Sequence, residues 1–315
     1  MLKLFTNSFG QEIICPVLRF ERGDDKINRK KIILTCLNHG DEIIGTMAAL
    51  QILELVKKDL NWKGELIILP CMNQGGLERS SRFFEIDNLY DTSTQNMNRL
   101  WGAGHNSLTG KVCDIVFEFL VSEKPDLVID CHSYSIKSLV HIILDRGNKE
   151  KELIQIAQNS KIPFYLEYEA QTVAEQKLDH CLTNQLLLNG ILAITIELGP
   201  QIGFDQHQLD LATKSLSNLV LGTSFDLFEM QNATDLKNKI THRQELKNES
   251  NFCGLFVPMC DLGKWLSKNT VVAIICNLVG EEICKIKMPC DGAILVFVRS
   301  NYVYPKATIC VIVKE

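Results

Sequence analysis

The sequence predicts an α/β protein, in which helices cover a sheet, followed by a small β domain. In the first two-thirds of the 315 residues, short apolar runs alternate with segments whose apolar residues recur at helical spacing. After a polar segment at 231–251, which we interpret as a linker, glycines separate short apolar runs, as is typical of a small β domain. We therefore expect a domain at 1–235 and a second at 236–315.

Short, mostly apolar runs predict buried strands, and periodic runs predict helices that pack on them. The predicted strands are 31–36, 65–70, 127–131, 139–144 and 191–197. The predicted core faces of the helices are Ile43, Met47, Leu50 and Leu53, and Val112, Ile115, Val116, Phe119 and Leu120. The segment 71–106 has few apolar repeats but many Asn, Gly and Arg residues, so we expect a long functional loop there.

The composition is that of an ordinary soluble protein, with 46% hydrophobic and 23% charged residues. The formal charge of -5, without a cationic cluster, argues against a nucleic-acid partner. No apolar run approaches membrane-spanning length and no signal peptide is evident, so we expect no membrane association and a cytoplasmic location. The 12 cysteines are scattered through apolar runs, which predicts mostly reduced core residues.

His39 and Glu42 lie where a predicted strand ends and an amphipathic helix begins. Their spacing can bring an imidazole and a carboxylate to one side of the turn, where both can meet one metal ion. Gly40 between them would allow close approach of the backbone. The alternative is that His39 caps the helix and Glu42 is a solvated first-turn carboxylate.

His132 and Glu197 each end a predicted apolar strand, and strand ends are where sites form in α/β sheets. His132 would complete a His, Glu, His ligand set with a fourth position for water. Glu197 could then accept the proton of that water and pass it to a departing nitrogen. A hydrogen-bonded sheet-edge histidine and a salt-bridged glutamate are the alternatives, and Asp130 fits either a partner of His132 or an ordinary strand-end residue.

These residues resemble, in order, the motifs of the succinylglutamate desuccinylase/aspartoacylase family, relatives of the zinc carboxypeptidases. The resemblance covers roughly residues 30 to 200, and four ordered elements are more specific than any one. The elements are His39-Gly40-Asp41-Glu42 for the family's His-Gly-x-Glu, Asn98-Arg99 for its Asn-Arg pair, Asp130-Cys131-His132 for its Asp-x-His, and Glu197-Leu198-Gly199 for its Glu-Leu-Gly.

The resemblance implies a carboxypeptidase-like mixed sheet flanked by helices, with one Zn²⁺ per chain held by His39, Glu42 and His132. It implies that Glu197 is the general base and that Asn98 and Arg99 grip a substrate carboxylate, since a guanidinium can bind it through two parallel hydrogen bonds. An upstream arginine of the family stabilises the oxyanion, and Arg82 is our choice, with Arg79 as the competitor.

Two departures from the family concern the substrate loop and not the metal. Asp41 stands where the family commonly has Asn, and Asn96-Met97 where it commonly has Asp-Leu. The C-terminal segment resembles the lipoyl-like half-barrel that some members carry. We expect no cofactor on Lys287, because it directly precedes a turn and is not at a hairpin tip between methionines. We expect this domain to shape the site or to form a contact in a homo-oligomer.

The predicted activity is zinc-dependent hydrolysis of the amide bond of an N-acyl amino acid or a related small substrate that bears a carboxylate. A carboxypeptidase with the same site is one alternative. A non-catalytic binding protein with a vestigial zinc site is an alternative of another class. The sequence leaves open the acyl group and the amino acid.

Overall fold

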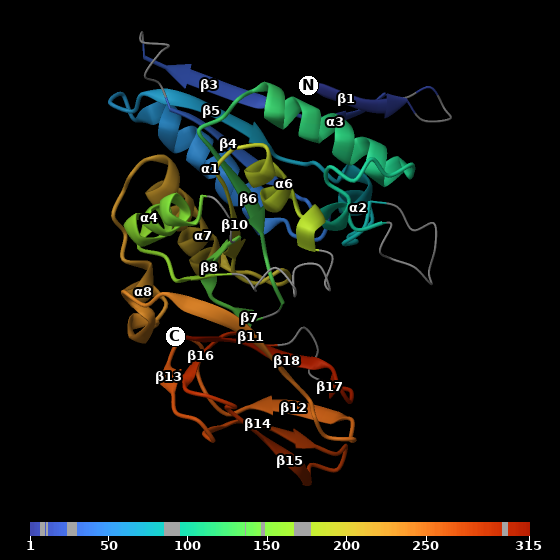
Figure 1. The fold of residues 1–315 in the computed structure, drawn as a ribbon, viewed down its shortest axis with the longest axis vertical. Helices are drawn as coiled ribbons and strands as arrows, with labels where there is room; N and C mark the ends of the chain where they lie inside the picture. Colours follow the sequence, from blue (N-terminus) through green and yellow to red (C-terminus); the bar gives the residue numbers. More distant parts are fainter. Residues whose placement is uncertain are drawn as a thin grey trace.

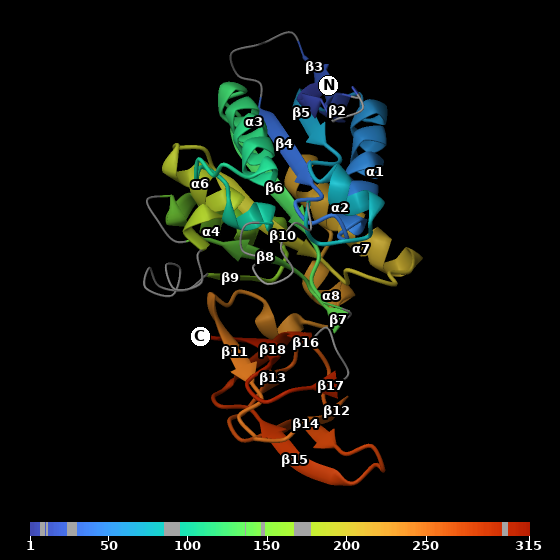
Figure 2. The same ribbon diagram turned by 90° about the vertical axis from the view of Figure 1, so that its right-hand side faces the viewer.

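The chain folds into an α/β body and a β-rich C-terminal part, which lie at opposite ends of the molecule (Figure 1). The computed structural model describes residues 1–6, 10, 12–23, 30–84, 95–135, 137–145, 149–166, 178–297 and 302–315. Figure 2 shows the same division from the side, with strands β12, β14 and β15 farthest from the helices. The α/β architecture predicted from the sequence, a mixed sheet flanked by helices and followed by a β-rich part, is confirmed.

One mixed 12-stranded sheet connects the two parts. Its central strands are parallel, from β5 through β4 and β6 to β10, and β8 then runs antiparallel to β10. In spatial order the strands are β3 (Leu18–Arg22), β5 (Gly64–Leu69), β4 (Lys31–Cys36), β6 (Leu127–His132), β10 (Ala193–Leu198), β8 (Val140–Leu144), β9 (Phe164–Leu166), β11 (Thr241–Lys247), β18 (Thr308–Lys314), β16 (Gly292–Phe297) and β13 (Trp265–Leu266), with β7 (Lys137–Ser138) beside β16.

Helices cover both faces of the parallel strands. Successive strand residues point to opposite faces, and in these strands both sets of side chains are mostly apolar, so each face packs against helices. Ile32 and Leu34 pack in a core with α1 (Ile44–Lys58), α4 (Glu150–Ser160) and α7 (Gln206–Val220). Ile33 points the other way, into a core with α3 (Leu108–Ser122) and α6 (Leu182–Leu188). Continuous apolar strands of this kind are expected where both faces of a sheet are buried.

The predicted core face of α1 was wrong for most of its residues. Ile43, Met47 and Leu50 are 40%, 42% and 38% exposed, and of the four only Leu53 is buried. The buried stripe is instead Ile44, Ala48, Ile52 and Val56, one helical position away from the predicted one. The two stripes are almost equally apolar, so helical periodicity alone could not choose between them.

The five predicted strands are present, with ends that differ by at most two residues, as β4, β5, β6, β8 and β10. In the described part of the predicted long loop, the structure has the short helix α2 (Gln74–Glu78) and the 3₁₀ turn η2 (Met97–Arg99). Residues 85–94 of that loop lie outside the described part of the chain.

The C-terminal part contributes β11, β18, β16 and β13 to the large sheet and forms a second sheet of its own. That antiparallel sheet runs β15 (Glu282–Lys287), β14 (Val271–Cys276), β12 (Gly254–Pro258), β17 (Tyr302–Val303). The prediction that 231–251 is a linker was wrong, because β11 pairs with β9 on one side and β18 on the other. Short helices, α8 (Leu227–Met230) and η4 (Thr234–Leu236), precede it.

The remaining elements lie at the edges of the body. A separate hairpin pairs β1 (Leu2–Thr6) with β2 (Glu12–Cys15), and the 3₁₀ turn η3 (Leu178–His180) precedes α6. All 12 cysteines fall within the described ranges, and each is a free thiol. Among the described helices, none combines the length and the apolar character that crossing a membrane requires.

Candidate metal centre

His39, Glu42 and His132 meet at one edge of the sheet because β4 and β6 are parallel neighbours. His132 is the last residue of β6, while His39 and Glu42 lie in the turn between β4 and α1. The close approach of another loop requires Gly40 in this turn. A Cβ atom on Gly40 would lie 2.2 Å from the carbonyl carbon of Gly76. Gly40 therefore allows α2 to pack closely against this turn.

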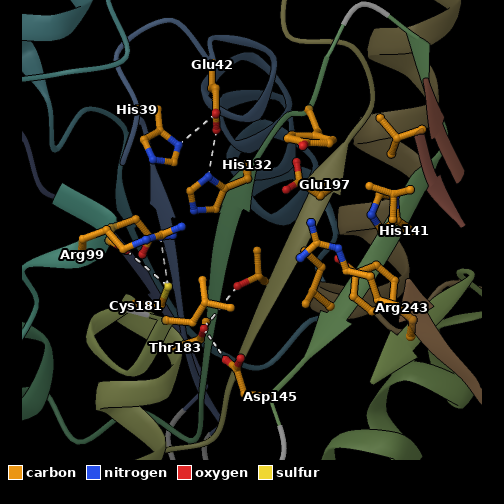
Figure 3. A pocket seen from close by; sticks show the side chains of 18 of the residues that line it. His39, Glu42, Arg99, His132, His141, Asp145, Cys181, Thr183, Glu197 and Arg243 are labelled. Carbon is orange, nitrogen blue, oxygen red and sulfur yellow. Dashed lines mark hydrogen bonds and ion pairs between the residues drawn. The ribbon is translucent and has the colours of Figure 1, made fainter. Parts of the chain in front are cut away.

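The three side chains form a compact, buried cluster (Figure 3). His39 Nδ1 lies 2.9 Å from Glu42 Oε1, and His132 Nδ1 lies 2.8 Å from Glu42 Oε2. The potential ligand atoms all lie within 4.8 Å of one another, and the residues are 2%, 1% and 3% exposed. Within the described ranges, this is the group of His, Cys, Asp or Glu residues that could hold a metal ion.

Asp130 fixes the orientation of His132 through Nε2, the ring nitrogen that does not face Glu42. Its carboxylate lies 2.9 Å from His132 Nε2 and also accepts hydrogen bonds from Thr35 Oγ1 at 2.8 Å and Asn38 Nδ2 at 3.2 Å. A carboxylate oxygen that already accepts from Asn38 acts as an acceptor toward His132 as well, so we assign the proton to Nε2 of His132. The Nδ1 lone pair of His132 therefore faces Glu42, as a metal ligand requires.

Asn96 orients His39 through a hydrogen bond to Nε2, as Asp130 orients His132. Its Oδ1 accepts a hydrogen bond from the backbone N–H of Asn98 at 3.0 Å, which identifies that atom as the amide oxygen. His39 Nε2, 3.1 Å from the same oxygen, must then be the donor. Its Nδ1 consequently presents a lone pair to Glu42. Burial lowers the pKa of His39 to about 4, so the ring is neutral at pH 7.

These hydrogen bonds make a metal ion chemically appropriate at the cluster. Two Nδ1 lone pairs face the Glu42 carboxylate, and such an arrangement needs a cation between them. In the absence of a metal, a proton on His132 can take the place of this cation. Burial opposes the protonation of His132, but the carboxylates of Asp130 and Glu42 raise its pKa well above 6.5. Two imidazole nitrogens and a carboxylate are a donor set that suits a divalent metal. The His, Glu, His cluster could therefore bind a metal ion.

Arg82 reaches the cluster and Arg79 does not. Arg82 Nη1 donates to Glu42 Oε1 at 2.9 Å and lines the cavity in front of the cluster. Arg79 donates to the backbone carbonyl of Phe84 instead and does not line that cavity. Asn73 connects the two loops, since its Nδ2 donates to the carbonyls of Asn38 and Arg82, each at 3.2 Å.

Asn98 and Arg99 lie in η2 and line the same cavity. The Asn98 side-chain oxygen accepts the backbone N–H of Leu182 at 3.0 Å, which anchors η2 to the start of α6. Arg99 Nη1 donates to the Asn98 carbonyl at 2.6 Å and contacts Cys181 Sγ at 3.4 Å. The predicted carboxylate-binding pair is thus held within reach of the cavity by backbone contacts.

Glu197 is placed beside the cluster by strand register. In the sheet it pairs with His132 of β6 on one side and His141 of β8 on the other. It is 9% exposed and lines the cavity, on the side of His132 away from Arg99 (Figure 3). The four residues predicted for metal binding and general base catalysis therefore converge on one cavity of about 280 Å³.

The far wall of this cavity comes from residues that sequence reasoning missed. Arg243 and Glu245 reach it from β11, where Arg243 Nη2 donates to Glu245 Oε1 at 2.8 Å. Asp145, which also lines the cavity, accepts a hydrogen bond from Thr183 at 2.5 Å. Burial lowers the pKa of His141, another wall residue, to about 4. The polar run of β11 shows no apolar alternation, so the sequence carries no signal that identifies Arg243 and Glu245 as cavity residues.

Comparisons with known proteins agree with this geometry. The family model "Succinylglutamate desuccinylase/Aspartoacylase catalytic domain" matches residues 28–222. A succinylglutamate desuccinylase from a Silicibacter species is 19% identical, with a TM-score of 0.74 over 98% of this chain and 92% of that one. The product-bound ectoine utilization protein EutE (DoeB) from Ruegeria pomeroyi is 18% identical, with a TM-score of 0.70 over 97% and 90%.

A third structure, a succinylglutamate desuccinylase/aspartoacylase from Rhodobacter sphaeroides, is 14% identical, with a TM-score of 0.72 over 98% of this chain and 92% of that one. At these identities the likeness to solved structures establishes the fold, and it extends over the C-terminal part that the family model does not reach. No curated protein matches the chain.

Proposed function

The chain belongs to the succinylglutamate desuccinylase/aspartoacylase family, and from this premise we propose that it is a zinc-dependent amidohydrolase. The observation that carries the proposal is the convergence of the His39, Glu42 and His132 cluster with Glu197 in one cavity. We propose one Zn²⁺ per chain, because a buried set of two imidazoles and a carboxylate is typical of catalytic zinc sites.

A bound Zn²⁺ would polarise the scissile carbonyl and lower the pKa of water. Glu197 would accept a proton from the attacking water as the new C–O bond forms. It would then return that proton to the amide nitrogen as the C–N bond breaks, which releases a carboxylic acid and an amine. Arg82, the cation beside Glu42, would stabilise the negative charge that develops on the carbonyl oxygen.

The proposed substrate is a small N-acyl amino acid. Asn98 and Arg99 would bind its carboxylate, for which a planar guanidinium is well suited. The cavity of about 280 Å³ is at the small end of ligand pockets, and Arg243 and Glu245 form its far wall, so a small molecule fits better than a peptide chain. On this proposal the domain at 1–235 supplies the chemistry and the domain at 236–315 completes the pocket.

The test is Glu197→Gln, which keeps the shape of the side chain and removes its basicity. We expect zinc content to stay near one ion per chain while kcat falls by a factor of about 10² to 10⁴ on a panel of N-acyl amino acids. Unchanged turnover would contradict the assignment of Glu197.

Two further results would separate the alternatives. Faster cleavage of short peptides than of N-acyl amino acids would favour the carboxypeptidase. A purified protein that binds no zinc and hydrolyses neither class of substrate would favour the binding protein.

A further inference from the structure

A second cavity adjoins the metal centre on the side of the C-terminal strands. It also measures about 280 Å³ and shares Tyr134, Val296 and Val311 with the first cavity. Tyr134 lies two residues after His132, while Val296 and Val311 are register partners on β16 and β18. The two cavities therefore meet along a common wall close to the proposed reaction centre.

The second cavity differs from the first in its chemistry. Three arginines line the first, Arg82, Arg99 and Arg243, whereas no described residue of the second carries a charge. Its wall is aliphatic and aromatic, with Phe297, Val303, Tyr302 and Tyr304 prominent. An apolar cavity of about 150 Å³ is enough to bind benzene, so this one has room for a larger apolar group.

The position of the cavity indicates which part of a substrate would enter it. Figure 3 shows Arg99 and Arg243 on opposite sides of His132. Val311 is the register partner of Glu245, two residues along β11 from Arg243, so the shared wall lies on the Arg243 side. A substrate whose carboxylate is held at Arg99 and whose amide is attacked beside His132 directs its acyl end toward that wall.

We propose that the second cavity is a subsite for an apolar acyl chain. The preferred substrates are then N-acyl amino acids whose acyl group is an alkyl chain longer than acetyl. This inference rests on the proposed function, because it assumes that the amide bond is cleaved at the cluster. It adds a substrate class, and it gives the C-terminal strands the task of selecting the chain.

Hydrolysis of a chain-length series measures the subsite directly. The substrates are acetyl, butyryl, hexanoyl and octanoyl derivatives of the amino acid that is released fastest from its acetyl form. We expect kcat/KM to rise about fourfold for each methylene group that enters the cavity, the factor that corresponds to about 0.8 kcal/mol of transfer free energy. Dissociation constants of acetate, butanoate, hexanoate and octanoate, measured by calorimetry on the zinc-loaded protein, should fall in parallel.

Ala307→Phe is designed to fill the subsite without touching the first cavity. Ala307 is partly buried and lines only the second cavity, and its backbone bonds to Tyr304 and Asn248 do not involve its side chain. The variant should hydrolyse the acetyl substrate like the wild type and lose the gain from longer chains. Ala307→Leu adds less bulk in case the phenylalanine prevents folding. Val279→Phe is the matched control, because Val279 is 80% exposed in the same part of the chain.

The outcomes distinguish the subsite from the proposed function. If the acetyl substrate is hydrolysed but kcat/KM does not rise with chain length, or if Ala307→Phe leaves a rise unchanged, the subsite is refuted and the hydrolase stands. If no N-acyl amino acid is hydrolysed, while alkanoates bind more tightly with length and Ala307→Phe abolishes that gain, the hydrolase is refuted and the apolar site stands.

Discussion

Asp130→Asn isolates the charge that supports His132. Asp130 Oδ2 faces both His132 Nε2 and Asn38 Nδ2, while Oδ1 accepts only the Thr35 hydroxyl. An asparagine can place its side-chain oxygen where Oδ2 was, toward His132 and Asn38, and its NH₂ group where Oδ1 was. The Thr35 hydroxyl can then rotate to accept a hydrogen bond from that NH₂ group. The substitution therefore preserves the geometry and removes the negative charge. Asp130→Ala removes the contacts as well.

Loss of such a partner typically weakens metal binding by a factor of 10 to 100, which corresponds to about 1.4 to 2.7 kcal/mol. We expect Asp130→Asn near the lower limit and Asp130→Ala near the upper one. Asn96→Asp makes the reverse change at His39, whose Nε2 now donates to a neutral amide, and should tighten zinc binding by about tenfold.

Zinc affinity is measured by competition with a chromophoric chelator, and circular dichroism of the zinc-free proteins checks that each variant is folded. If both Asp130 variants bind zinc as the wild type does, the reasoning that Asp130 orients His132 is refuted. If Asp130→Asn matches the wild type and Asp130→Ala does not, hydrogen-bond geometry matters and charge does not.

Two further predictions concern the cavity walls. Arg82→Ala should lower kcat by a factor of about 10² to 10³ on N-acyl amino acids, whereas Arg79→Ala, outside the cavity, should leave kcat near that of the wild type; equal effects would contradict the choice of Arg82. His141→Gln should reduce the loss of folding stability in acid. The pKa of His141 is about 4 in the folded protein and 6.5 in the unfolded chain, so protonation of His141 favours unfolding. In the wild type this lowers the free energy of unfolding by up to about 3 kcal/mol as the pH falls from 6.5 to 4. Denaturant unfolding at pH 7 and pH 4 measures this loss, and an equal loss in the variant would show that His141 is not its source.

The His39, Glu42 and His132 cluster could be predicted because its residues are local or occupy strand ends. His39 and Glu42 are three residues apart, and His132 ends an apolar run whose strand character was plain. Parallel neighbouring strands then bring their ends together without further information. The partner Asn96 could not be assigned in the same way, because 57 positions of the sequence separate it from His39 and it does not end a predicted strand.

The face of α1 and the far wall of the cavity could not be predicted for a different reason. On α1 two adjacent stripes are apolar, and only the packing of α7 and the sheet decides which is buried. In β11 the burial pattern is mostly intermediate, because the strand forms part of a polar cavity wall. A strand that faces a charged cavity lacks the apolar alternation that identifies ordinary half-buried strands.

The role of β11 can be tested at two positions of the strand that differ in what they face. Arg243 lines the cavity with a side chain only 13% exposed, whereas Lys247 ends the strand in solvent. If β11 is a wall of the active site, Arg243→Gln should lower kcat/KM by about tenfold or more without loss of zinc, because it removes a charged donor worth about 1.5 to 3 kcal/mol. Lys247→Gln should have no such effect. Equal kcat/KM values for the two variants would mean that β11 only connects the domains, as the linker interpretation predicts. In a strand that only connects domains, neither Arg243 nor Lys247 contacts the substrate, so their replacement should affect the reaction equally.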